Sequence, residues 1–209
     1  MTVIAFVGKP RTGKTLHMTF MAYDALKQGH KIFANYKLMF PYTQVDQYDM
    51  LRIPFDDVDR EPKTLCIQEA DKIFDSHRSM KNENTLLSSL TGQAGKRNLN
   101  IYYDTQFWNR IDGSLRYVTE YICSCSCIVN TLDKSPVAFE YTMIDTYDMS
   151  EKHYVIPATI LKPYYSMYNS YETTKPLVGS KSMQEISGQE QEIEENAKPK
   201  RRKRNTFEQ

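Results

Sequence analysis

The sequence predicts an α/β fold with a mainly parallel central sheet flanked by helices. An apolar run, Val3–Val7, is followed by a glycine-rich stretch and then by a helical pattern over residues 14–28. Residues 31–36 follow that helix at once and have the composition of a second strand. Two strands joined by a helix are the opening unit of a parallel α/β domain.

The glycine-rich stretch matches the pattern of a phosphate-binding loop, or P-loop. It reads G-x-x-x-x-G-K-T and consists of Gly8, Lys9, Pro10, Arg11, Thr12, Gly13, Lys14 and Thr15, with Leu16 continuing the helix. The glycines let backbone N–H groups converge, and the helix N-terminus adds unpaired donors and a positive dipole end. Lys14 would reach the β- and γ-phosphates and Thr15 would hold Mg²⁺. We therefore predict ATP and Mg²⁺ as cofactors, with residues 8–16 forming the nucleotide contacts.

Length and composition indicate one domain with an appended segment. The chain has 209 residues, and its 27 lysines and arginines nearly balance 26 aspartates and glutamates, for a net charge of +1. Any basic surface for nucleic acid must therefore be local. No stretch of about 18 apolar residues and no signal-peptide pattern occurs. We expect a cytoplasmic protein without a transmembrane segment.

The four cysteines are interpreted as small buried thiols. Cys123, Cys125 and Cys127 alternate with serines in an expected strand, which puts all three on one face. Their C-x-C-x-C spacing differs from the paired spacing of zinc sites, and Cys66 lies on another expected strand.

Gly29 is expected to end the first helix, since glycine favours the position just after a helix. The connection over residues 37–62 is too long for a simple loop, so it is expected to contain a short helix near residues 56–60.

Residues 64–68 form the next expected strand, at the place where a P-loop ATPase has its acidic Walker B strand. Glu69 is the candidate catalytic base, with a carboxylate favoured at a helix start as the alternative. Thr15, Gln68 and Glu69 are the candidate metal residues. Gln68 stands where a charged aspartate is usual, and an amide cannot offset the charge of Mg²⁺. Either hydrolysis is slow, or Asp71 compensates.

A helix is expected over residues 84–93, and then a strand over residues 99–106 that ends in Thr105 and Gln106. In P-loop ATPases with an extra strand between the P-loop and Walker B strands, the RecA/ASCE-like arrangement, a polar residue at this tip contacts the γ-phosphate. Gln106 is the candidate for that sensor, and a solvent-facing polar residue is the alternative.

Residues 109–118 suit a short helix that carries Arg110 and Arg116. Beyond it, residues 121–129 and 137–149 are strand-like and flank a turn, which predicts a C-terminal β-hairpin.

We predict a P-loop ATPase domain at residues 1–178 and a disordered, acidic-then-basic tail at residues 179–209. The tail ends in a basic run over residues 198–204. Three interpretations of that run stay open: a solubilising tail, a DNA contact and a targeting signal.

These motifs together resemble the Zot-like P-loop ATPases of filamentous phages, within the FtsK–HerA group that includes viral genome-packaging ATPases. The resemblance covers about residues 2–175. It is carried by the Gly8-Lys9-Pro10 opening, Ile32–Asn35, a run from Arg97 through Thr105-Gln106 and Ile111-Asp112 to Arg116, and the segment at residues 168–173. The sequence departs from the family at Arg11, where glycine is frequent, at Gln68, and in lacking a transmembrane segment, which favours a packaging motor over a membrane-bound extrusion ATPase.

The resemblance implies a motor that moves double-stranded DNA into a capsid. ATP would lie between subunits of a hexameric or pentameric ring, with Lys14, Glu69 and Gln106 catalytic and an arginine supplied by a neighbour. Arg97, Arg110 and Arg116 are the candidates, and Arg116 is the first choice, with a surface salt bridge as the alternative for each. Capsid or membrane-vesicle proteins are implied partners, and the location is the host cytoplasm or the virion.

Three other functions stay open. A nucleotide-dependent scaffold protein would have weak or no hydrolysis because of Gln68, and a Zot-type extrusion ATPase would share the same site. A small-molecule kinase would need an arginine-rich lid segment, which the sequence does not show.

Overall fold

The computed structural model describes residues 1–46, 49–50, 61–76 and 98–169, all of which lie in one compact unit, Met1–Pro176. Several predictions fall outside these residues: the helices at 56–60 and 84–93, Arg97, and the tail from residue 179. They stay predictions.

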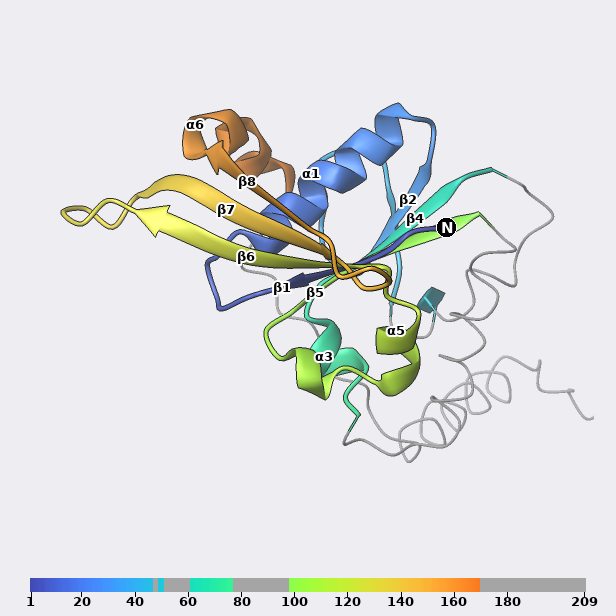
Figure 1. Ribbon diagram of the computed structural model, residues 1–209. Helices are drawn as coiled ribbons and strands as arrows, with labels where there is room; N and C mark the ends of the chain where they lie inside the picture. Colours follow the sequence, from blue (N-terminus) through green and yellow to red (C-terminus); the bar gives the residue numbers. More distant parts are fainter. Residues whose placement is uncertain (47–48, 51–60, 77–97, 170–209) are drawn as a thin grey trace, which may run out of the picture. The chain divides into compact units, whose positions relative to one another are not determined.

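The described residues form an eight-stranded sheet with the order β3-β2-β4-β5-β1-β6-β7-β8 (Figure 1). Its strands are β1 (Val3–Val7), β2 (Lys31–Ala34), β3 (Thr43–Gln44), β4 (Lys63–Ile67), β5 (Leu99–Thr105), β6 (Tyr121–Val129), β7 (Pro136–Asp145) and β8 (Glu151–Pro157). Every pair from β3 to β6 is parallel, whereas β6, β7 and β8 pair antiparallel. The predicted α/β fold with a mainly parallel sheet is confirmed.

The order of the central strands is that of the RecA/ASCE-like arrangement. The P-loop strand β1 pairs with β5, and β5 pairs in turn with β4. Val3 and Leu65 both lie opposite Ile101, so the three strands are in register. Because parallel strands end at the same edge of a sheet, the residues that follow β1, β4 and β5 converge there.

Helices cover both faces of the sheet. In Figure 1, α1 (Lys14–Lys27) and α6 (Ala158–Leu161) lie on one face, and α3 (Ala70–Ile73) and α5 (Gly113–Tyr117) lie on the other. The core under α1 joins apolar side chains of the helix and the sheet, among them Phe6, Met18, Ala22 and Tyr102.

Helix α1 ends before Gly29, as the sequence predicts, although its last helical residue is Lys27 and not residue 28. Gly29 has φ of 88°, a left-handed conformation that glycine adopts without steric cost. Its N–H bonds to the Leu26 carbonyl at 3.0 Å, and the His30 N–H bonds to the Ala25 carbonyl at 3.0 Å. These bonds satisfy carbonyl groups that the helix end would otherwise leave without partners.

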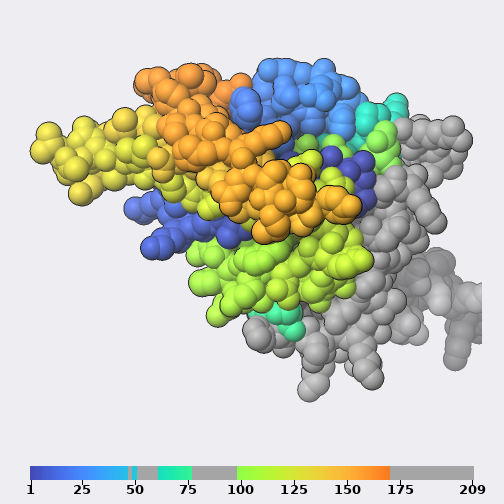
Figure 2. Space-filling model, in the orientation of Figure 1, coloured from blue at the N-terminus to red at the C-terminus, as the bar shows by residue number. Residues whose placement is uncertain are grey.

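The β6–β7–β8 segment packs on α1 through a buried aromatic cluster. His17 of α1 is in ring contact with Tyr141 of β7, with ring centroids 4.0 Å apart. The two ring nitrogens of His17 contact Cys123 Sγ at 3.6 Å and the Tyr154 hydroxyl at 3.2 Å. The hairpin thus holds the first turns of the P-loop helix, while its far tip, yellow in Figure 2, stands out from the other described residues.

The predicted hairpin is confirmed, but its second strand, predicted over residues 137–149, is shorter than expected at its end. β7 ends at Asp145, a turn follows, and β8 begins at Glu151. In that turn the Asp145 side chain accepts a hydrogen bond from the Tyr147 N–H, and the Asp148 side chain accepts one from the Ser150 N–H, both at 2.8 Å. Aspartate side chains that bond backbone two residues on favour turns over strands.

The helix predicted over residues 109–118 is divided in two. The 3₁₀ helix η2 (Trp108–Arg110) is separated from α5 by the extended residue Ile111. The Asp112 side chain accepts a hydrogen bond from the Ser114 N–H at 2.8 Å and so caps α5. Within the described part of the chain, no helix combines the length and apolar character that a membrane span requires.

Candidate nucleotide-binding site

Both P-loop glycines occupy positions that a larger residue could not fill. A Cβ on Gly8 would lie 2.5 Å from the backbone oxygen of Cys125 in β6. Gly13 has φ of 84°, and a Cβ there would lie 2.6 Å from Cδ1 of Phe139 in β7. The loop is therefore packed directly against the hairpin.

Lys14 and Thr12 close the loop on itself. The Lys14 Nζ donates to the Lys9 carbonyl at 2.9 Å, and the Thr12 hydroxyl donates to the same oxygen at 2.8 Å. The Lys14 side chain is buried, and Arg11 takes a left-handed conformation with φ of 65°. The curl of the loop is thus fixed by its own polar groups.

The end of β4 is held by Asn35, which follows β2. The Asn35 side chain accepts a hydrogen bond from the Gln68 N–H at 2.7 Å and donates one to the Gln68 carbonyl at 3.0 Å. Glu69 then takes a left-handed conformation with φ of 54°, which is uncommon for a residue with a side chain and typical of functional sites. Its carboxylate pairs with Lys72 of α3 at 2.6 Å.

A buried carboxylate that the sequence analysis missed lies at the centre of this edge. Asp104 of β5 is only 2% exposed. One of its oxygens accepts a hydrogen bond from the Thr15 hydroxyl, and the other accepts one from the Glu69 N–H at 2.7 Å. Burial raises the pKa of the Asp104 carboxyl, while these two hydrogen bonds and the charge of Lys14 oppose that rise. A charged residue inside an apolar strand was the available sequence signal.

Asp71, which the sequence analysis considered as a substitute for the missing metal carboxylate, contacts the tip of β5. Its Oδ1 accepts a hydrogen bond from the Thr105 hydroxyl at 3.0 Å and one from the Gln106 N–H at 3.4 Å. The Thr105 hydroxyl also accepts from the Phe107 N–H at 3.0 Å. Asp71 therefore fixes the tip of β5, including the backbone of the predicted sensor Gln106.

The two described candidate arginines differ in their surroundings. Arg110 lies in η2, close behind Gln106, and is exposed, with its guanidinium 4.7 Å from the centre of the Phe107 ring. Arg116 lies in α5 and is half-buried, and its Nε is buried without a hydrogen-bond partner among the described residues.

The residues at this edge fit a Mg²⁺ ion. Mg²⁺ prefers oxygen ligands, often through bound water. The Thr15 hydroxyl, the Asp104 carboxylate and the Gln68 amide supply such oxygens. The Gln68 Oε1 is buried and has no hydrogen-bond partner among the residues that the structure describes, so it is an acceptor to which a metal-bound water could donate.

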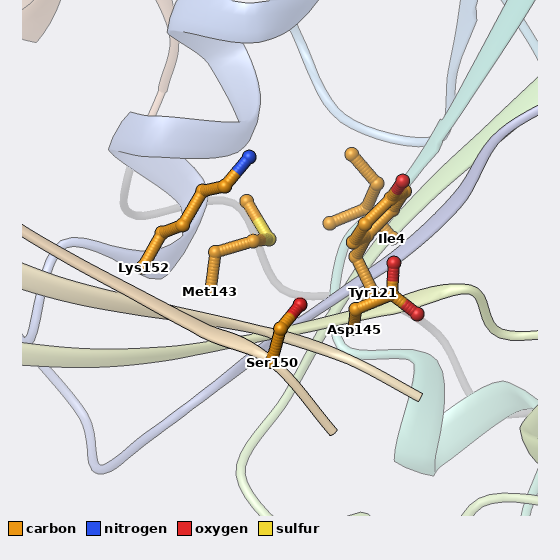
Figure 3. Close-up of a pocket in the computed structure, with 6 residues that line it drawn as sticks. All are labelled: Ile4, Tyr121, Met143, Asp145, Ser150 and Lys152. Atoms are coloured by element: carbon orange, nitrogen blue, oxygen red, sulfur yellow. The ribbon is translucent and has the colours of Figure 1, made fainter. Parts of the chain in front are cut away.

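A separate pocket has a volume of about 270 Å³. It is lined by Ile4, Tyr121, Met143, Asp145, Ser150 and Lys152 (Figure 3). These residues lie at the amino ends of β1 and β6 and beside the β7–β8 turn, whereas ligands of open α/β sheets bind at the carboxyl ends. It includes none of the predicted site residues.

Comparison with solved structures shows that the chain has the fold of P-loop NTPases. One similar structure is the N-terminal domain of zonular occludens toxin from Neisseria meningitidis, with a TM-score of 0.58 and 19% sequence identity over 80% of this chain and 98% of that chain. Another is the genome packaging NTPase B204 from Sulfolobus turreted icosahedral virus 2 in complex with ATP-gammaS, with a TM-score of 0.53 and 10% identity over 73% of this chain and 96% of that chain.

The conjugation coupling protein TcpA of pCW3, with ATPgS, has a TM-score of 0.53 and 9% identity over 79% of this chain and 64% of that chain. No protein-family model and no curated protein matches the chain. The resemblance inferred from the sequence is confirmed at the level of the fold, in which a Zot domain and a viral packaging NTPase are structural neighbours.

Proposed function

We propose that this chain is a Mg²⁺-dependent ATPase that moves double-stranded DNA, and that it packages a viral genome into a capsid. The observation that carries the proposal is the convergence of a complete P-loop with the ends of β4 and β5, where Thr15 meets a buried carboxylate. Phosphate-binding donors, oxygen ligands and candidate proton acceptors are then within one small region.

Each predicted residue has a role in this proposal. Phosphate oxygens would replace the Lys9 carbonyl as the acceptor of the Lys14 ammonium. Mg²⁺, when bound, neutralises charge on the phosphates, and Thr15 and Gln68 would hold it directly or through water. Glu69 would accept a proton from the attacking water, and Gln106 would contact the γ-phosphate.

DNA as the cargo is supported by the names of two structural neighbours, a genome packaging NTPase and a conjugation coupling protein. A ring of subunits around the DNA, in the host cytoplasm or attached to the virion, belongs to the same proposal. The Zot-type alternative, in which the ATPase extrudes phage DNA, is supported by the likeness to the toxin domain.

For the arginine that crosses to a neighbouring site, the described surroundings favour Arg110. A residue that reaches another subunit must be exposed, and Arg110 is exposed beside the tip of β5. Arg116, the first choice from the sequence, keeps part of its guanidinium buried in its own subunit.

The test is steady-state ATP hydrolysis with and without double-stranded DNA, by the wild type and by Lys14→Ala and Glu69→Gln. We expect DNA-stimulated turnover that falls by about 100-fold or more in both variants, since each loses a group that acts on the transition state. Binding of ATP without turnover would support the scaffold instead, and phosphate transfer to a nucleoside would support a kinase.

A further inference from the structure

We propose that Asp104, and not residue 68, supplies the carboxylate that offsets the charge of Mg²⁺ in this site. The inference rests on the proposed function, because it concerns how the chain binds Mg²⁺ with ATP. It would explain how a P-loop site can work although a neutral glutamine stands where the Walker B aspartate is expected.

The register of the sheet places Asp104 in the same row as that position. Phe6 of β1 lies opposite Asp104 of β5, and Ile67 of β4 lies opposite Tyr103, so the next residue, Gln68, follows beside Asp104. Neighbouring residues of parallel strands in register point to the same face. Phe6 contacts His17 of α1, so the shared face is the one that α1 covers.

The contacts of Asp104 are those of a group that serves the metal and the catalytic loop together. Its two oxygens accept from the Thr15 hydroxyl and from the Glu69 N–H. Thr15 is the predicted metal ligand of the P-loop and Glu69 the predicted base. One carboxylate of β5 thus bonds both to the first turn of α1 and to the residue that caps α3 after β4.

The burial of Asp104 is costly unless a cation compensates for it. An ionised carboxylate loses its hydration when it is 2% exposed. The charge of Lys14 acts on Asp104, but the Lys14 ammonium bonds to the Lys9 carbonyl, and no lysine or arginine among the described residues forms an ion pair with Asp104. Sites that bind charged ligands retain such groups at the expense of stability. A bound divalent cation would supply the missing compensation.

Gln68 complements this arrangement. Its backbone is fixed by Asn35, and its Oε1 is a buried acceptor without a described partner. A neutral amide in the row beside Asp104 avoids the repulsion of two adjacent carboxylates. The negative charge in this arrangement therefore lies on β5, whereas a Walker B aspartate would place it at the end of the neighbouring strand β4.

The experiment measures the dissociation constant of ATPγS in Mg²⁺ and in EDTA. The wild type is expected to bind ATPγS more tightly in Mg²⁺ than in EDTA, and the ratio of the two dissociation constants is the Mg²⁺ enhancement. Asp104→Asn keeps the shape of the side chain, so its affinity in EDTA should change little, whereas its Mg²⁺ enhancement should fall by about 10–100-fold. Asp145→Asn is the control, since Asp145 lies at the β7–β8 turn, away from this edge, and its side chain accepts a hydrogen bond from the Tyr147 N–H that an asparagine oxygen can also accept. It should retain the enhancement.

A second variant tests the proposal with Asp104 in place. If Asp104 already supplies the charge, Gln68→Asp should add less than about twofold to the Mg²⁺ enhancement, whereas a gain of about tenfold would show that the site lacked its carboxylate and would overturn the proposal. The double variant Gln68→Asp with Asp104→Asn should recover the enhancement that Asp104→Asn loses.

The remaining outcomes separate the two proposals. If Asp104→Asn weakens ATPγS binding equally in Mg²⁺ and in EDTA, Asp104 only holds the loop in place, and the inference is overturned. If the variant keeps the full Mg²⁺ enhancement, the inference is also overturned, although the proposed ATP binding stands. A wild type that binds no ATPγS in either buffer would overturn the proposed function and this inference with it.

Discussion

Asn35 illustrates how one side chain can hold the end of a strand at a candidate site. It satisfies both the N–H and the carbonyl of Gln68, and nothing in the strand pattern of its own segment requires an amide there. Its value lies in the position that it imposes on Gln68 and, through the chain, on Glu69.

Asn35→Ala is therefore expected to affect stability and catalysis together. The free energy of unfolding, measured with urea, should fall by about 1–3 kcal/mol, because buried backbone groups lose their partners. Turnover should fall by about tenfold, because a small misplacement of a catalytic group is costly. Asn100→Ala is the control, since Asn100 bonds the Thr2 N–H at 2.9 Å, far along β5 from the site. Turnover that is equal in the two variants would contradict the role of Asn35.

The two left-handed glycines that flank α1, Gly13 and Gly29, give a second prediction at this scale. Gly29→Ala meets no atom within 4 Å and should cost about 1–2 kcal/mol of unfolding free energy, the penalty of the left-handed backbone. Gly13→Ala adds a contact with the Phe139 ring at 2.6 Å and should cost more, with loss of ATP binding. Thermal unfolding and nucleotide titration of both variants provide the measurement, and equal costs would show that the loop can move away from the hairpin.

At the scale of elements, β6 shows the alternation that its sequence predicts. Cys123 and Cys125 are buried, and Cys127, further along the strand, is half-buried. Cys66 in β4 is also buried. Burial raises the pKa of the Cys66 and Cys127 thiols, which lowers their thiolate fraction at neutral pH.

We expect the folded protein to expose one of its four thiols to a thiol reagent such as Ellman's reagent. Cys127 should react first because it alone is partly accessible, and all four should react in denaturant. Cys127→Ser should remove the fast phase. Rapid reaction of two or more thiols in the folded state would show that the hairpin opens away from α1.

The elements that were predicted well are those whose signal is local. The β1–loop–α1 unit has apolar periodicity, a glycine motif and a terminating Gly29 within one short segment. Asp104 was missed because its importance is set by strand pairing: the order β4-β5-β1 brings a carboxylate near the end of β5 against Thr15. The contacts of Asp71 with Thr105 and Gln106 could not be predicted for the same reason, since these partners are distant in the sequence.

At the scale of the whole molecule, ligand binding should stabilise the fold as a unit. The site joins the ends of β1, β4 and β5, so a ligand that binds there holds the centre of the sheet together. Saturating ATPγS with Mg²⁺ should add about 2.7 kcal/mol of stability at 100 times the dissociation constant. Differential scanning fluorimetry should show this as a rise in Tm that Lys14→Ala abolishes. A rise of equal size in Lys14→Ala would place the ligand elsewhere.

The proposed ring makes a prediction that a single subunit cannot satisfy. If Arg110 acts on a neighbour's ATP, Arg110→Ala and Glu69→Gln subunits should each be nearly inactive alone, since an arginine in trans contributes about 10³–10⁵-fold. In a mixture of the two, an Arg110→Ala subunit keeps its own Glu69 and receives Arg110 from a Glu69→Gln neighbour. With random mixing, about one interface in four is then intact, and a corresponding fraction of wild-type turnover should return. A mixture of Arg116→Ala with Glu69→Gln subunits decides between the two arginines. Turnover that returns only in that mixture would assign the role to Arg116, and turnover that returns in neither mixture would show that neither arginine crosses an interface.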